Sequence, residues 1–221
     1  MGRSGPPARK LASIAVETGE GGRATARLKG VPLQYANALR RICLNGIMVF
    51  AIDTVDVVSN TSSLPDEALA HRLGLVPLRT DLSEFQNLRA IDVNESSNRV
   101  LLVLDEEADE TRTVLSGDLS SQDPYVKPAT GRIPIVQLAP GQVVKAEAYA
   151  RLGRGTEHAK WNSANIAVLT EGDAEGEHVL TVESTGALEP AVILSAAIDE
   201  LQGRLEDFRD VVGGLKAAPA A

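Results

Sequence analysis

The sequence PAVILSAAIDELQGRLEDFRDVV, at residues 190–212, is the most regular pattern in the chain. Large apolar residues recur there at spacings of four, three, four, three and four. The stripe consists of Leu194, Ile198, Leu201, Leu205, Phe208 and Val212. This spacing predicts one long helix with an apolar side and charged residues on its other sides. At the helical rise per residue, that helix would be roughly 35 Å long.

The apolar stripe has to be covered in the folded protein. Fully burying six large apolar side chains would contribute on the order of 9–18 kcal/mol as an upper bound. A helix of this length can extend beyond its own small domain, and a stripe with heptad spacing is often covered by a second chain. The alternative is that the chain's own N-terminal helix and sheet cover the whole stripe. The spacing alone leaves both interpretations open.

The composition limits the classes of function. The 221 residues carry a formal net charge of −8, and only 3% of them are aromatic. Because proteins that bind nucleic acid by themselves usually present a basic face or stacking aromatic side chains, we expect no direct DNA binding by this chain alone. The sequence shows no secretory signal and no apolar run of about 20 residues. We therefore expect a cytoplasmic protein without a membrane segment.

Cys43 is the single cysteine of the sequence. One thiol cannot form an internal disulfide, a four-thiolate zinc site or an iron–sulfur cluster. Since Cys43 falls within a helical pattern, we expect it to pack as a small apolar group. The sequence also contains no GxSxG motif and no clustered histidines, so we predict no catalytic residue and no metal ligand.

The remaining pattern predicts a mixed α+β fold. An N-terminal hairpin should turn at the glycines of residues 19–22, and a helix should follow from residue 32 to residue 47. A short helix should begin at residues 65–67 and end near residue 74. The predicted strands cover residues 11–17, 24–29, 50–59, 99–105, 112–115, 133–138, 143–152, 166–169 and 178–182.

Two groups of residues could carry chemistry. Glu67 and His71 share a face of the short helix, which could make an acid/base pair or half a metal site, but acidic residues in a first turn are more often caps. The glycine-containing loop 153–161 could bind phosphate, or it could present Arg154 and Trp161 to a protein partner. We favour capping for the first group and a partner contact for the second. His178 falls within a strand pattern and is interpreted as a strand residue.

Several segments together resemble a known family. They are residues 36–42 (ANALRRI), 51–53 (AID), 60–62 (NTS), 66–78 (DEALAHRLGLVPL), 153–161 (GRGTEHAKW) and 182–188 (VESTGAL). At these spacings they resemble the alpha-like family of DNA-dependent RNA polymerase subunits, in the archaeal and eukaryotic branch that includes the third-largest eukaryotic polymerase subunit. The resemblance extends over about residues 10–213.

The resemblance implies a particular architecture and role. A discontinuous dimerisation domain, with two long helices on an antiparallel sheet, would comprise residues 8–48 and 165–215. A mainly β domain would be inserted at residues 49–164. The chain would be a non-catalytic scaffold of an archaeal RNA polymerase, forming a heterodimer with subunit L. Subunits N and P would be neighbours, and the dimer would be the platform for the second-largest catalytic subunit.

The resemblance also implies contact residues. For the subunit L interface they are Leu39, Ile42, Leu194, Ile198, Leu201, Leu205 and Phe208. For the large subunit they are Arg40, Arg41, Glu67, His71, Arg72, Arg154, His158, Lys160 and Trp161. The chain departs from many archaeal relatives in one respect. Only 16 residues separate Trp161 from His178 and none is a cysteine, so the iron–sulfur insertion and its cluster are expected to be absent.

A second departure lies after the first helix, where residues 47–49 stand at the position of a proline turn in relatives. Two rival functions stay open at this point. One is a generic homodimerising module without a polymerase role. The other is a small enzyme that uses His71 or His158.

Overall fold

The structure is a computed structural model that describes residues 13–19, 21–82 and 99–217, with only the backbone described for residues 215–217. Within these ranges the chain forms three α-helices and several antiparallel sheets, which confirms the predicted α+β class. Two separate clusters of buried side chains lie on either side of a junction near residues 46–49. Among the described residues, no helix combines the length and apolar character needed to cross a membrane.

The first sheet joins strands from both ends of the described chain. In spatial order they are β1 (Ser13–Gly19), β2 (Arg23–Lys29), β10 (Glu177–Ser184) and β9 (Ala164–Glu171), all antiparallel. Gly21 and Gly22 form the turn after β1 with φ angles of 73° and 74°, a left-handed conformation that glycine adopts without strain. Alternation along β2 buries Ala24, Ala26 and Leu28 on one face of the sheet.

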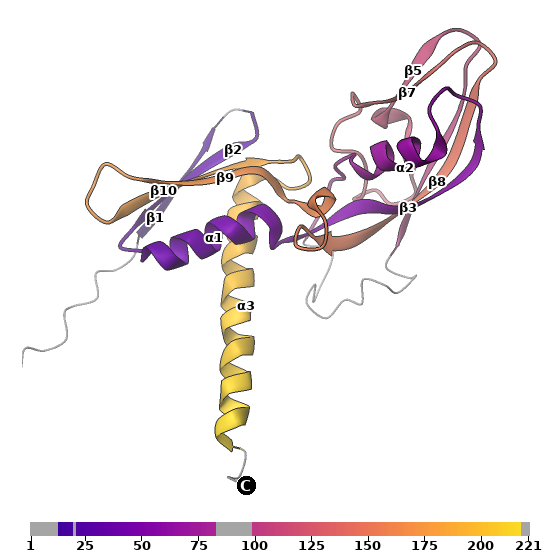
Figure 1. The fold of residues 1–221 in the computed structure, drawn as a ribbon. Helices are drawn as coiled ribbons and strands as arrows, with labels where there is room; N and C mark the ends of the chain where they lie inside the picture. Colours follow the sequence, from indigo (N-terminus) through magenta and orange to yellow (C-terminus); the bar gives the residue numbers. More distant parts are fainter. Residues whose placement is uncertain (1–12, 20, 83–98, 218–221) are drawn as a thin grey trace, which may run out of the picture.

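Two helices pack against that face. They are α1 (Leu33–Asn45) and α3 (Pro190–Ala217). Buried residues of both helices, such as Ile42, Cys43 and Ile193, join the apolar side of β2 and β10 in one cluster. Figure 1 shows that α3 begins at the sheet, crosses α1 and then extends away from the rest of the molecule. The first core therefore holds only the N-terminal part of the long helix.

The second sheet belongs to the middle of the sequence. Its strands in spatial order are β3 (Met48–Asn60), β8 (Val143–Arg154), β4 (Val100–Glu107) and β6 (Ser120–Ser121). Beside it lie the pair β5 (Arg112–Leu115) and β7 (Pro134–Leu138), the helix α2 (Asp66–Gly74) and the short turns η2 (Ser116–Asp118) and η3 (Ala159–Trp161). Leu69 and Leu73 of α2 pack on Phe50 and Ile52 of β3.

The junction between the two cores is short. α1 ends at Asn45, and the N–H group of Gly46 donates to the carbonyl of Ile42 at 2.8 Å. Ile47 is buried, and β3 begins directly at Met48, so residues 47–49 lead straight into a strand. Met48 pairs with Arg154 across β3 and β8. The chain thus enters and leaves the second sheet at neighbouring positions.

The predicted elements agree with the structure apart from their ends. The long helix continues to Ala217, five residues past the predicted end, and β8 extends to Arg154 into the predicted loop. Residues 11 and 12 of the first predicted strand lie outside the described residues.

Candidate protein interaction surface

The long helix leaves the core partway along its apolar stripe. Leu194 and Ala197 are buried against the first sheet and α1. Beyond them, Ile198 is 43% exposed, Leu205 50% and Phe208 67%. The periodicity that built the helix therefore continues past the point where this chain covers it (Figure 1). In the part of the chain that the structure describes, the stripe is covered at one end and open at the other.

A cavity extends the open stripe toward the sheet. It has a volume of about 290 Å³ and lies between α1, α3 and the apolar side of β1 and β2. Its lining includes Ile14 and Val16 of β1, whose side chains are about half exposed, together with Leu39, Leu194 and Ile198. Ile198 also lines a second hollow of about 340 Å³ along α3, so the two hollows lie next to each other. We define the α3–β1 surface as Ile14, Val16, Ile198, Leu201, Leu205 and Phe208.

The seven residues predicted for the subunit L interface divide into two groups. Leu39, Ile42 and Leu194 are buried within this chain, although Leu39 and Leu194 reach the cavity wall. The other four line or extend the open stripe: Ile198, Leu205 and Phe208 are exposed, whereas Leu201 is partly buried against the first core. Sequence reasoning missed Ile14 and Val16 of β1. The sequence predicted a strand at residues 11–17, but only the folded structure places its side chains at the cavity beside α3.

Cys43 lies at the wall of the same cavity and is buried, as predicted. Burial raises the pKa of its thiol to about 12, with a smaller opposing contribution from a backbone hydrogen bond. The thiol is therefore neutral at physiological pH and contributes an apolar surface. It does not have the low pKa of a nucleophile.

The loop after β8 packs around the buried side chain of Trp161. Trp161 is 2% exposed and donates its indole N–H to the carbonyl of Arg151 at 3.2 Å. The guanidinium of Arg151 and the ammonium of Lys160 lie 4.3 Å and 4.2 Å from the ring centroid, at cation–π distance. Gly153 packs so closely against the ring that no side chain would fit there. Trp161 is therefore a core residue and not the surface anchor that we expected.

Asp53 of β3 holds the two cations beside that ring. Its carboxylate accepts from Nζ of Lys160 at 2.8 Å and from Nε of Arg151 at 2.8 Å. Partial burial alone would raise the pKa of Asp53, but the hydrogen bonds and charges of Lys160 and Arg151 outweigh it and lower the pKa. The network ties β3, β8 and η3 together. It leaves Lys160 engaged within the chain.

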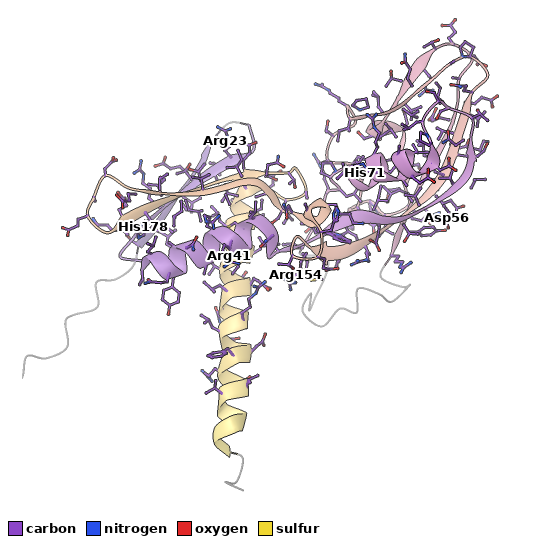
Figure 2. The ribbon with its side chains drawn as sticks, in the orientation of Figure 1. Arg23, Arg41, Asp56, His71, Arg154 and His178 are labelled. Carbon is purple, nitrogen blue, oxygen red and sulfur yellow. The ribbon has the colours of Figure 1, made fainter. Side chains whose placement is uncertain are left out.

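Arg154 also points inward. Its Nη1 donates to the carbonyl oxygen of Gly46 and forms an ion pair with Glu200 of α3 at 2.9 Å. Figure 2 shows Arg154 at the junction of α1, α3 and the second sheet. His158 is exposed, and its Nδ1 accepts from the backbone N–H of Lys160 at 3.1 Å. The structure does not support phosphate binding by this loop, because η3 is a single short turn and not a helix whose N-terminus could bind an anion.

The remaining predicted contact residues lie on two helices. Asp66 and Glu67 stand in the first turn of α2, where negative charge is favourable, and Asp66 accepts from Asn60 at 2.7 Å. His71 and Arg72 follow on its exposed side, and Arg72 donates to the carbonyl of Pro134 at 2.8 Å. Pro65 is at the N-cap and no side chain caps α2 by a hydrogen bond, so the acidic residues act here through their charge and not as the caps that we expected.

Arg41 of α1 is exposed, while Arg40 donates to Asn37 at 2.9 Å. Figure 2 shows His71 and His178 on separate parts of the molecule. Among the described residues, no group of three or more histidine, cysteine or acidic side chains is placed to hold a metal ion.

Comparison with known proteins places the chain in a family. The family model for the RNA polymerase Rpb3/RpoA insert domain matches residues 52–174. The chain is 47% identical over 134 residues to DNA-directed RNA polymerase subunit Rpo3 of Pyrococcus horikoshii, covering 61% of this chain and 50% of that protein. It is 45% identical over 147 residues to the Rpo3 subunit of Pyrobaculum aerophilum, covering 64% and 56%. The chain thus spans about half the length of the curated relatives that it matches.

Proposed function

The chain belongs to the RNA polymerase Rpb3/RpoA family, whose insert domain it carries at residues 52–174, and on that basis we propose that it is a non-catalytic assembly subunit of an archaeal DNA-directed RNA polymerase. In this role it forms a heterodimer with the small subunit L. The dimer is the platform on which the catalytic subunits assemble. Nucleotidyl transfer takes place in other chains.

The open α3–β1 surface is the observation that carries this proposal. Fully burying a large apolar side chain contributes about 1.5–3 kcal/mol, so covering the exposed parts of Ile198, Leu205 and Phe208 contributes roughly 2–5 kcal/mol. That amount is too small to offset the loss of translational and rotational freedom on association. The partner must therefore also fill the cavity beside β1. A helix of subunit L lying along α3, with apolar side chains entering the cavity, meets both requirements.

The two separate cores support a division of the chain into two domains with different roles. We propose that residues 8–48 and 165–215 form the dimerisation domain and that residues 49–164 form the inserted domain. The first buried cluster gathers side chains from both ends of the sequence, and the second gathers side chains from its middle. Residues 8–12 of this proposal lie outside the described residues.

The exposed charges suggest where larger partners bind. We propose that Arg40, Arg41, Glu67, His71, Arg72 and His158 remain candidates for contacts with the second-largest catalytic subunit, with subunits N and P as further neighbours. Arg154, Lys160 and Trp161 are removed from that group because their side chains are engaged within this chain.

We also propose that this chain holds no iron–sulfur cluster. β9 ends at Glu171 and β10 begins at Glu177, so only a tight turn occupies the position expected for the insertion. Cys43, the single cysteine of the sequence, is buried in the first core.

Co-expression with a subunit L homologue tests the proposal. The expected result is a one-to-one complex in light scattering after gel filtration, and association with the larger polymerase subunits in a pull-down. The double variant Leu201→Glu, Leu205→Glu places two charges on the α3–β1 surface and should abolish the complex while the second sheet stays folded.

The matched control for that variant is Val58→Glu, which adds a charge at a residue of β3 that is 68% exposed and lies away from the α3–β1 surface. It should leave the complex intact. A chain that ignores subunit L and forms a homodimer would instead favour a generic dimerisation module. Unchanged affinity in the double variant would show that the interface lies elsewhere.

A further inference from the structure

The ion pair between Arg154 and Glu200 lies where α3 leaves the core. Ala197, one turn before Glu200, is fully buried, and Leu201, directly after Glu200, is partly buried against the first core, whereas Leu205, one turn further on, is 50% exposed. Glu200 is therefore among the last residues of α3 that still contact the body of the molecule. The contacts that fix the position of Glu200 therefore also influence the direction of the rest of α3.

One guanidinium connects three elements at this point. Arg154 ends β8, its Nη1 donates to the carbonyl of Gly46 at the end of α1, and the same nitrogen lies 2.9 Å from Oε1 of Glu200. The side chains of Arg154 and Glu200 are only 23% and 13% exposed, so solvent screens their attraction less than that of a surface pair. The carbonyl of Gly46 is one of those that a helix end leaves without a helical partner. The arginine satisfies it.

The backbone around Arg154 is itself fixed. A Cβ atom at Gly155 would lie 2.7 Å from Cβ and 2.8 Å from Cα of Asn45, so the absence of a side chain lets the loop pack directly on the end of α1. On the other side, Arg154 pairs with Met48 in the second sheet. The guanidinium thus extends from a rigid base.

The open part of α3 acts as a long lever on this base. Residues 201–217 extend about 25 Å at the helical rise, so a tilt of about 10° would move the far end by about 4 Å. At Phe208, roughly 12 Å beyond Glu200, the same tilt gives a shift of about 2 Å. That shift exceeds the gap of about 0.5–1 Å between the surfaces of side chains in contact, so it would separate Phe208 from a partner residue packed on it. Docking along the whole stripe therefore requires a fixed direction of α3.

We propose that Arg154 is a positioning residue that fixes the direction of α3 by holding Glu200 to the end of α1, and so pre-organises the α3–β1 surface for its partner. The effect on the partner rests on the proposed function. The direction of α3 does not, because it is a property of this chain alone. The loop at residues 153–155 thereby acts on the interface from inside the molecule.

Spin-label distances in the full chain test the direction directly. Labels at Thr54→Cys on β3 and Asp210→Cys on α3 report the helix relative to the second sheet, and both parent residues are exposed. Cys43 is fully buried and stays unlabelled. The expected result is one narrow distance distribution in the parent and a distribution shifted or broadened by several Å in Arg154→Ala. Arg154→Lys, which keeps the charge, should restore it in part.

Arg204→Ala is the matched control. Arg204 donates to the same Oε1 of Glu200 at 2.8 Å, but from within α3, so its removal should leave the distribution unchanged. If Arg154→Ala fails to fold, Glu200→Gln removes the charge from the other side with the same expected broadening. A parent-like distribution in folded Arg154→Ala or Glu200→Gln overturns the inference, because apolar packing alone would then set the direction of α3.

Partner binding provides a second readout. Phe208→Ala should weaken the complex with subunit L about tenfold in the parent. In an Arg154→Ala background the tip of α3 no longer meets its partner, so the same change should have little further effect. Ile14→Ala, near the base, should weaken both backgrounds equally. Equal losses from Phe208→Ala in the two backgrounds would contradict a positioning role. Absence of any complex with the parent would contradict the proposed function and leave the distance measurement to decide the role of Arg154.

Discussion

Replacing Gly153 with alanine should destabilise the chain through a single added methyl group. A Cβ atom at Gly153 would lie 2.5 Å, 2.6 Å and 2.8 Å from Cε2, Cδ2 and Nε1 of Trp161, well inside contact distance. The indole has little room to move, because it is buried, donates to the carbonyl of Arg151 and lies against two cations. Overpacking a core costs about 1–3 kcal/mol, and three simultaneous clashes place this change near about 2–3 kcal/mol.

The assay is urea unfolding of the purified chain, followed by the fluorescence of Trp161, the single tryptophan. In a thermal scan the same loss corresponds to a decrease in Tm of roughly 4–12 °C for a chain of this size. Gly213→Ala is the matched control, because none of the described residues comes within 4 Å of a Cβ atom at that position on α3, and alanine favours a helix by up to about 1 kcal/mol. A Gly153→Ala variant as stable as the parent would refute the close packing of the loop on the indole.

Three further outcomes follow from the same region. Asp53→Asn should lower the free energy of unfolding by about 1 kcal/mol at pH 7, because the lowered pKa of Asp53 shows that its ionised carboxylate stabilises the folded state. In unfolding measured as a function of pH, the difference from the parent should shrink as the pH falls below about 4. Cys43, with a pKa of about 12, should not react with a thiol reagent at pH 8 until urea unfolds the chain, as absorbance would show. Ser163→Ala removes a buried hydroxyl that donates to the carbonyl of Cys43 at 2.8 Å, and calorimetry should show a loss of about 1–2 kcal/mol.

Local patterns in the sequence predicted the three helices and all the strands except the two-residue β6, and they predicted neither η2 nor η3. The spacing from Leu194 to Val212 predicted α3, and the alternation of small apolar with polar residues in β8 predicted a half-buried strand. Periodicity depends only on local geometry, so it could not show that the burial of the stripe ends near Ile198. That boundary depends on the length of the sheet and on α1, which are set by pairing between distant segments. For the same reason Ile14 and Val16 were predicted as strand residues and not as part of the α3–β1 surface.

The loop at residues 153–161 was harder to interpret. Glycines, a tryptophan and several charges in one short segment are also typical of an exposed binding loop, so Trp161 was expected at the surface. Its burial depends on Gly153 and on Asp53, about 100 residues earlier in the sequence, and no local pattern contains that contact. Arg154 was likewise assigned outward, because Glu200 is brought near it only by the crossing of α3 over α1.

Met48 and Arg154 are paired across β3 and β8, so the chain enters the second sheet and leaves it at adjacent positions. Insertions or deletions between those two positions change the length of the middle segment but not the distance between its two ends. The distance between α1 and α3 therefore does not depend on the length of the middle segment. A family built on this plan can vary its middle segment widely while the pair of helices that meets the partner keeps its geometry.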